Sequence, residues 1–255
     1  MPTRLRSLLW LGLFAAPAFA GLIALGFWQL DRLAWKEALI AEVSARVAAP
    51  PVDAPPEADW ARIAPADYEY RHVRLAGTYE FAHQALVFRA LDQPRGHFSG
   101  PGYLVLTPLR LTDGAHVIVN RGFVPADQKA RFVAESGEGA ANIAVTGLMR
   151  ASEPRTWFTP ADDPARGEWF TRDPGAIAAA LKLTRAAPFT IDADATGIAG
   201  DLPQGGETIL AFPNNHLGYA FTWFGMALAL AGVFCAFAAT RLRAPGAENG
   251  GHDRD

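Results

Sequence analysis

Two long apolar runs frame the chain, near its beginning and near its end. Residues 8–30 and 217–239 contain no charged side chain. An α-helix rises about 1.5 Å per residue, so a run of about 23 residues crosses a hydrocarbon core of about 30 Å. The pattern predicts two transmembrane helices, over residues 8–30 and, with an interfacial start, over residues 214–239.

The first apolar run is followed by a polar segment in which apolar residues still recur every three or four positions. Pro50 then interrupts the spacing, and a proline-rich stretch follows up to Asp59. Spacing of this kind predicts a helix that continues out of the membrane, and the prolines predict a turn-rich connector. We therefore expect residues 31–59 to link the first membrane helix to a separate domain.

From Tyr70 onward the apolar period changes from helical spacing to alternation. Five short runs rich in Val, Tyr, Phe and Leu are separated by Gly, Pro and Asp, a pattern typical of an antiparallel sheet that could close into a barrel. Pro174 precedes a helical stretch, and another strand pattern follows that helix. The predicted strands are residues 70–81, 84–91, 102–112, 115–125, 142–151 and 187–194.

The fold class that these patterns predict is an integral membrane protein. Its two transmembrane helices flank an exported, β-rich α+β domain over residues 60–213. Arg241 and Arg243 follow the second apolar run, while residues 204–216 before it contain no Lys or Arg. The positive-inside rule then predicts that residues 240–255 are cytoplasmic, and two spans place residues 1–7 on the same side. The domain is expected in the periplasm, at a bacterial inner membrane.

A secretory signal peptide is the alternative for the first run. Arg4 and Arg6 precede it, and the AFA sequence at residues 18–20 resembles a signal-peptidase site. The apolar run continues beyond this motif to Leu30, whereas the apolar part of a signal peptide ends near its cleavage site. This continuation favours an uncleaved anchor. The last ten residues, 246–255, have the composition of a disordered tail.

Composition excludes several functional classes. The net charge is −3 and no Lys/Arg-rich block is present, so nucleic acid is not an expected partner. The only cysteine, Cys235, lies in the second apolar run, so the exported domain holds no disulfide and no thiolate metal site. The sequence also lacks a nucleophile elbow, a phosphate-binding glycine loop and a metalloprotease helix motif. We expect a protein that is not an enzyme.

His216 stands at the mouth of the second apolar run and has two interpretations. In the first, Asn214 or Asn215 caps the helix and His216 lies in the wet interface without a function. In the second, small residues on one face pack against the first helix, which would leave His216, Tyr219 and Trp223 facing away from it. The small residues in question are Gly218, Thr222, Gly225, Ala229, Gly232 and Ala236.

A histidine beside aromatic residues at a membrane interface has the properties of an axial haem ligand. Arg32 and Lys36 follow the first apolar run and could hold the propionates of a haem. The expected ligand to the haem iron is His216, and no free metal ion is expected.

Three motifs in this order resemble the surfeit-locus family of assembly factors for haem-copper terminal oxidases. They are GFWQLDRLAWK at residues 26–36, VNRGFVP at residues 119–125 and NNHLGYAFTWF at residues 214–224. The segments EPRTWFTPADDP and EWFTRD are also similar to the family's middle segment, although Asp162 stands where we expect asparagine. The resemblance covers nearly the whole chain.

The resemblance implies work in cytochrome c oxidase biogenesis. The implied partners are subunit I of the oxidase, haem-synthesis or other assembly proteins, and membrane lipid. The implied cofactor is haem a, bound transiently for insertion into the catalytic subunit. By resemblance, the haem site would contain His216, Tyr219, Trp223, Trp28, Gln29 and Arg32.

A partner-binding role is implied for Asn120, Arg121 and Gly122, together with Asn214 and Asn215. The alternative for the first three is structural: a turn after a strand, with Gly122 at positive φ. Two other functions stay open at this point. One is a scaffold that stabilises an oxidase assembly intermediate without binding haem, and the other is a membrane-anchored periplasmic sensor.

Overall fold

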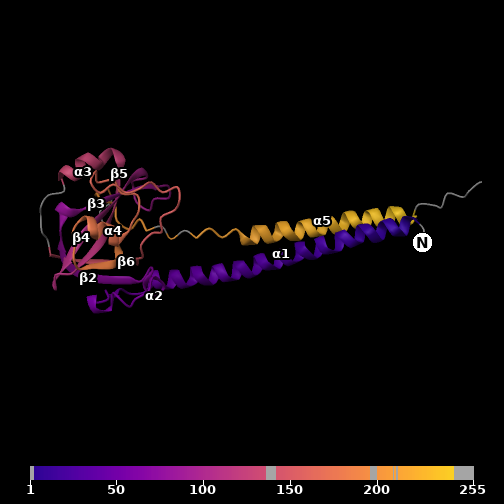
Figure 1. Cartoon of the computed structure of the whole chain (residues 1–255), viewed down its shortest axis with the longest axis horizontal. Helices are drawn as coiled ribbons and strands as arrows, with labels where there is room; N and C mark the ends of the chain where they lie inside the picture. Colours follow the sequence, from indigo (N-terminus) through magenta and orange to yellow (C-terminus); the bar gives the residue numbers. More distant parts are fainter. Residues whose placement is uncertain (1–2, 136–141, 196–199, 209, 211, 244–255) are drawn as a thin grey trace, which may run out of the picture. The chain divides into compact units, whose positions relative to one another are not determined.

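A computed structural model shows the arrangement of the chain (Figure 1) and describes residues 3–135, 142–195, 200–208, 210 and 212–243. The chain divides into two compact units. One consists of residues 1–41 and 212–255, and the other of residues 42–211. The predicted disordered tail, residues 246–255, lies outside the described residues.

The first unit contains two long helices. Helix α1 spans Thr3–Ala48, of which residues up to Ala41 belong to this unit, and helix α5 spans His216–Arg243. Both are long and apolar enough to cross a bilayer. The predicted membrane helix and the predicted helix after it form one continuous element that ends at Ala48, ahead of two prolines. A residue before proline is driven out of the α conformation, so the helix ends where the sequence predicts.

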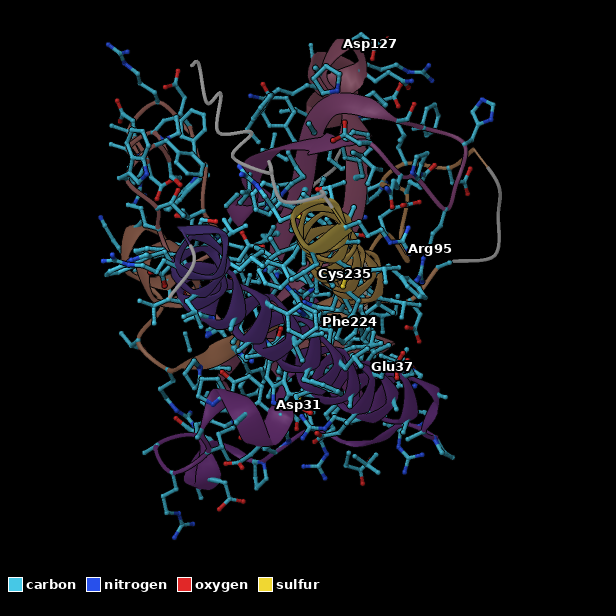
Figure 2. The ribbon with its side chains drawn as sticks, turned by 90° about the vertical axis from the view of Figure 1, so that its right-hand side faces the viewer. Asp31, Glu37, Arg95, Asp127, Phe224 and Cys235 are labelled. Carbon is cyan, nitrogen blue, oxygen red and sulfur yellow. The ribbon has the colours of Figure 1, made fainter. Side chains whose placement is uncertain are left out.

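The contact between α1 and α5 uses residues that differ from those expected. A Cβ atom added to Gly26 would lie 2.4 Å from the ring of Phe224, which lies where the two helices meet (Figure 2). The rings of Phe27 and Phe224 also pack edge to face, with centroids 5.5 Å apart. On α5 the buried residues are Ala220 and Ala227. Gly26 therefore allows the close approach of the two helices.

The predicted packing face of the second helix is wrong. A Cβ atom added to Gly218, Gly225 or Gly232 would meet nothing within 4 Å, and these glycines are exposed. Both sides of such a helix are apolar, so small residues alone do not show which side meets the neighbouring helix. In this helix pair the ring of Phe224 on α5 packs against Gly26, and the glycine is on α1.

The second unit is built on one sheet of seven strands among the described residues, in the order β1-β2-β6-β7-β5-β4-β3, with an additional β2–β4 pairing. Every predicted strand is present, and β1 is an addition within the expected connector. The strands are β1 Val52–Asp53, β2 His72–Tyr79, β3 Ala85–Leu91, β4 Gly100–Leu111, β5 His116–Pro125, β6 Asn142–Arg150 and β7 Ala186–Ala193.

The sheet is mixed, whereas the sequence predicted antiparallel pairing throughout. Strand β1 pairs with β2 in parallel, and β5 pairs with β7 in parallel. Strand β6 lies between β5 and β7 in the sequence and runs antiparallel to β7. The chain therefore reverses direction through β6, and β7 runs in the same direction as β5. The domain is a mixed sheet, and the additional β2–β4 pairing joins strands β2, β6, β7, β5 and β4 in a closed circuit.

Short helices connect the strands of this unit. Helix α4, Pro174–Ala180, begins where the sequence predicts, because Pro174 takes a first-turn position and the carboxylate of Asp173 accepts hydrogen bonds from two backbone amides. The remaining helical segments are η1 Glu57–Asp59, α2 Pro65–Tyr68, η2 Phe81–His83, η3 Ala126–Gln128 and α3 Lys129–Glu135.

The alternating pattern of β5 supplies both faces of the sheet with core residues. Val117 and Val119 join a cluster that includes Phe189, while Ile118 points to the opposite side, into a cluster with Phe123. Asn120 is a polar residue in this strand and only 8% exposed. A polar side chain buried at this depth needs hydrogen-bond partners, and they identify one of the two candidate sites.

Candidate functional site

The first candidate site joins the two helices of the first unit. Nδ1 of His216 lies 2.7 Å from Oε1 of Gln29. Gln29 is buried, at 8% exposed, and His216 is half-buried. An amide oxygen only accepts hydrogen bonds, so Nδ1 is the donor in this contact, and an imidazole with its hydrogen on Nδ1 alone would keep the lone pair of Nε2.

His216 therefore meets α1, and the prediction that it points away from the first helix is wrong, whereas Tyr219 is 56% exposed. The physical reason is that Gln29 needs a partner in an apolar contact, and the imidazole provides one. The sequence had grouped Gln29 with His216 only by resemblance, and the structure brings the two side chains into direct contact.

Other polar groups of this unit have no hydrogen-bond partner among the described residues. They are Nε1 of Trp223 and Oδ1 of Asn214, and both atoms are buried. Trp223 lies seven residues after His216, two helical turns farther along α5. The carbonyl of Asn215 accepts a hydrogen bond from the backbone amide of Tyr219, which is an ordinary helical bond, and Oδ1 of Asn214 caps no backbone amide among the described residues.

The remaining predicted haem-site residues are on the surface of this unit. Trp28 and Tyr219 are each more than half exposed. The guanidinium of Arg32 lies 3.8 Å from the ring centroid of Trp35, and the ammonium of Lys36 lies 5.7 Å from the ring of Phe212. Their role toward a haem stays a prediction.

The donor set of the helix pair fits an axial haem ligand. An imidazole that binds a metal almost always donates its other N–H to an oxygen acceptor, which fixes the tautomer and the ring orientation. The Gln29–His216 hydrogen bond has this arrangement. The buried indole N–H of Trp223 is a further donor without a partner among the described residues.

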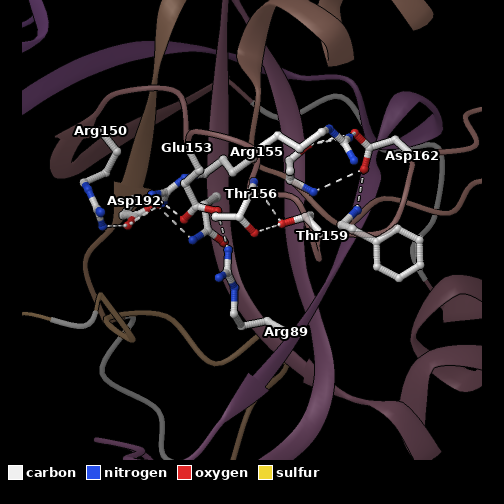
Figure 3. Close-up of polar contacts among 12 residues, drawn as sticks. Arg89, Arg150, Glu153, Arg155, Thr156, Thr159, Asp162 and Asp192 are labelled. Carbon is white, nitrogen blue, oxygen red and sulfur yellow. Dashed lines mark hydrogen bonds and ion pairs between the residues drawn. The ribbon is translucent and has the colours of Figure 1, made fainter.

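The second candidate site is a buried ionic cluster in the β-domain, centred on Asp192 of β7 (Figure 3). Its carboxylate is 4% exposed and accepts hydrogen bonds at 2.8–3.1 Å from Arg172 and Arg150. Asn120 and Thr208 each donate to it at 2.9 Å. These donors come from strands β5 and β6 and from two loops, so the cluster ties together distant parts of the domain.

Two further carboxylates balance the arginines of this cluster. Glu153 accepts from Arg172 at 3.1 Å and from Arg89 at 2.5 Å. Glu69 accepts from Arg150 at 2.8 Å. Three guanidinium groups thus face three carboxylates, and Nε of Arg172 is buried without a partner among the described residues.

Burial and charge oppose each other in this cluster. Burial alone would raise the pKa of Asp192, but Arg172, Arg150 and the hydrogen bonds from neighbouring side chains outweigh it and hold that pKa below its ordinary value. The pKa of Glu153 is also lowered, because Arg172 and Arg89 outweigh the effect of burial. Both carboxylates are therefore ionised at neutral pH, as a structural ion-pair network requires.

The motif at Asn120–Gly122 contributes to this structural network. Oδ1 of Asn120 accepts from the backbone amide of Gly122, which has a φ of 137°. A Cβ atom on Gly122 would lie 2.2 Å from the carbonyl oxygen of Gln204, so glycine is required there. The positive φ is confirmed, but the motif lies within β5 rather than in a turn after it.

Arg121 is the motif residue whose surroundings differ from those of its neighbours. Its guanidinium stacks over the rings of Tyr79 and Phe81, at 5.4 and 4.7 Å. Burial lowers the pKa of Arg121, and burial raises the pKa of Tyr79 to about 12. Asn120 and Gly122 are buried, so any direct contact of this motif with a partner would fall to Arg121.

Sequence reasoning missed the ionic cluster. Its members are spread over the sequence from Glu69 to Thr208 and come from four strands and the segments between them, so no local spacing marks them. One sign was available: Asp192 interrupts a strand of apolar residues, and charged residues at such positions are almost never buried unless paired.

These features define a class: a mixed β-domain held by a buried ionic cluster, in a chain with two apolar helices joined by a glutamine–histidine contact. The sequence model of the SURF1 family matches residues 16–228, which include both candidate sites. The chain belongs to the SURF1 family.

Individual relatives show the same similarity over most of the chain. Surfeit locus protein 1 of Mus musculus is 34% identical over 227 residues, covering 85% of this chain and 71% of the relative. The Homo sapiens protein of that name is 34% identical over 216 residues, covering 80% and 70%. A SURF1-like protein of Drosophila melanogaster is 34% identical over 235 residues, covering 86% and 74%.

Proposed function

We propose that this protein is an assembly factor for a haem-copper terminal oxidase and that it receives haem a through His216 for insertion into the catalytic subunit. The observation that carries this proposal is the 2.7 Å contact between Nδ1 of His216 and Oε1 of Gln29. It leaves Nε2 with the lone pair that an iron ligand needs. Membership of the SURF1 family supports the assembly role.

The proposal treats α1 and α5 as the membrane anchor. Trp10 and Trp28 on α1 are 61% and 55% exposed. They are separated by about 27 Å along a helix, close to the thickness of the hydrocarbon core, and tryptophan is enriched at both membrane interfaces. This spacing supports an interface near Gln29 and His216, where a transiently bound haem could be taken up and released.

Charge supports the orientation that the proposal requires. Arg241 and Arg243 lie in the last turn of α5. Basic residues at this end favour a cytoplasmic carboxyl terminus, so the β-domain would lie on the opposite side, in the periplasm of a bacterium. In this orientation the Gln29–His216 contact would be at the periplasmic interface.

Each residue of the helix pair then has a chemical role. His216 offers Nε2 to the iron, and Gln29 holds the imidazole by accepting from Nδ1. Trp223 has a buried N–H available for hydrogen bonding to an oxygen group of the cargo. Arg32 and Lys36 supply positive charge for the propionates.

A scaffold that stabilises an assembly intermediate without haem is the second candidate. The exposed glycines Gly218, Gly225 and Gly232 support it, because small residues on a membrane helix allow another helix to approach closely. Under this function the Gln29–His216 hydrogen bond would serve only to hold α1 against α5. The visible spectrum of the purified protein distinguishes the two functions.

A further inference from the structure

A turn in the β-domain presents two large apolar side chains to solvent. Trp157 is 95% exposed and Phe158 is 70% exposed. Their rings pack edge to face, with centroids 5.5 Å apart. Other tryptophans of this domain behave differently: Trp60 and Trp169 are buried. Exposure of adjacent Trp and Phe side chains to water is unfavourable, so this pair indicates a surface that binds a partner or a membrane.

The turn is held by its own hydrogen bonds. The backbone amide of Thr159 donates to the carbonyl of Thr156 at 3.1 Å, and the two hydroxyl oxygens lie 2.7 Å apart (Figure 3). The amide of Thr156 donates to Oγ1 of Thr159 at 3.2 Å. Trp157 and Phe158 are the central residues of this turn, so the two rings project together from a closed loop.

The base of the turn is fixed to the domain by Asp162 and Arg155. Asp162 accepts from the amide of Phe170 at 2.6 Å and from the hydroxyl of Thr171 at 2.7 Å. The guanidinium of Arg155 pairs with Asp162 and donates to the carbonyl of Pro160. Asp162 thus holds the turn in place, and the two exposed rings are presented without an entropic cost of ordering the loop on binding.

We propose that Trp157 and Phe158 insert into the lipid–water interface of the bilayer that holds α1 and α5. An indole has a large apolar body and one polar N–H, which suits the headgroup region. The exposed apolar surface of the turn consists of two adjacent rings, which is small for the packed centre of a protein–protein interface. Insertion into a fluid apolar phase needs no shaped pocket, so it fits the pair better.

The covalent connection to the two helices and the ion pairs near the turn also favour the lipid bilayer as the binding surface. The domain is covalently joined to both apolar helices, so a membrane that holds them is present at high effective concentration. Near the turn, Arg155 pairs with Asp162 and Arg166 with Asp163. These pairs neutralise the local charge, so insertion depends on the two rings rather than on anionic lipid.

The test uses the full chain in phosphatidylcholine vesicles and spin labels on single cysteines. Cys235 is first replaced in Cys235→Ala, and a label is then attached in Phe158→Cys. Leu228→Cys, on the exposed face of α5, is the control for a position in the bilayer, and Asp127→Cys is the control for an aqueous position. Collision with oxygen marks lipid, and collision with a water-soluble nickel complex marks water.

We expect the oxygen-to-nickel collision ratio at position 158 to exceed that at position 127 severalfold and to approach that at position 228. Adding Trp157→Ser should lower the ratio at position 158 severalfold, while the domain stays folded because Trp157 is exposed. Adding anionic phosphatidylglycerol should leave the ratio unchanged.

Three results would overturn the inference. A label at position 158 that resembles the one at position 127 would place the turn in water. A label shielded from both collision partners would indicate a second copy or another protein at the turn. The inference rests on the membrane anchoring proposed above, and an aqueous label at position 228 would refute that anchoring directly, whereas the first two results leave it intact.

Discussion

The side chains of Gln29 and His216, 187 residues apart in sequence, meet at 2.7 Å between Oε1 and Nδ1. This relationship couples the two apolar helices and at the same time selects the imidazole tautomer. The coupling of α1 to α5 would serve a scaffold equally well. The position of the imidazole hydrogen matters only if Nε2 of His216 binds a ligand.

Gln29→Leu removes the acceptor from Nδ1 of His216 and should lower the affinity for haem a by about 10- to 100-fold, the usual effect of losing such an oriented ligand contact. Gln29→Glu keeps an acceptor and should retain most of the affinity. Titration of the detergent-solubilised variants with haem a, followed by Soret absorbance, measures both. Equal affinity of the parent and Gln29→Leu would separate this hydrogen bond from ligand binding.

Gly26→Leu should disrupt the contact between α1 and α5, because its Cβ atom alone would lie 2.4 Å from the ring of Phe224. Overpacking of this kind costs about 1–3 kcal/mol. Gly225→Leu is the matched control, since a Cβ atom there meets nothing within 4 Å. Disulfide crosslinking between cysteines placed on the two helices should fall in Gly26→Leu only. Loss of crosslinking in Gly225→Leu would indicate that the small-residue face of α5 contacts α1.

Asp192→Ala leaves the guanidinium groups of Arg172 and Arg150 without their shared carboxylate. Breaking a buried ion pair from one side typically costs about 3–5 kcal/mol. Asp53→Ala removes the exposed ion pair with Arg74, at 2.7 Å, and should cost less than about 1 kcal/mol. Urea unfolding of the full chain in detergent, followed by tryptophan fluorescence, compares the two; equal costs would contradict the placement of Asp192 in a buried ion-pair network.

The stability of the β-domain should fall in acid. The pKa values of Asp192 and Glu153 are lowered in the folded state, so the unfolded chain binds protons more readily as the pH falls. Their stabilising contribution is present above the unfolded pKa values of about 4 and is lost as the pH drops through the folded values. Urea midpoints between pH 7 and pH 3 measure this. Asp192→Asn should show a shallower dependence, and an unchanged slope would contradict the assignment.

Much of the β-domain could be predicted from the sequence, because alternation along a half-buried strand is a local property. The parallel pairing of β5 with β7 could not, since it depends on the path of a connection of about sixty residues. The prediction of the packing face of α5 was wrong for a related reason. In a helix that is apolar on all sides, burial leaves no pattern, and the glycine that mattered, Gly26, lies on the other helix.

The residues of the candidate sites could also be predicted only in part from the sequence. His216 could be singled out from one short motif, because a histidine at the start of an apolar run is unusual. Its contact with Gln29 was not predictable from spacing, and resemblance alone had placed the two in one region. The cluster around Asp192 was missed entirely, since its pairs join residues that are far apart in sequence.

The visible spectrum of the protein purified from cells that make haem a tests the central claim most directly. The parent should show Soret absorption, and His216→Ala should lack it while remaining folded and membrane-bound, because α1 and α5 still pack through Gly26 and Phe224 although Gln29 loses its hydrogen-bond donor. Loss of oxidase assembly in the same variant would support delivery of haem. If the parent shows no Soret absorption and gains none on titration with haem a, His216 is not a haem ligand and the protein acts as a scaffold without haem.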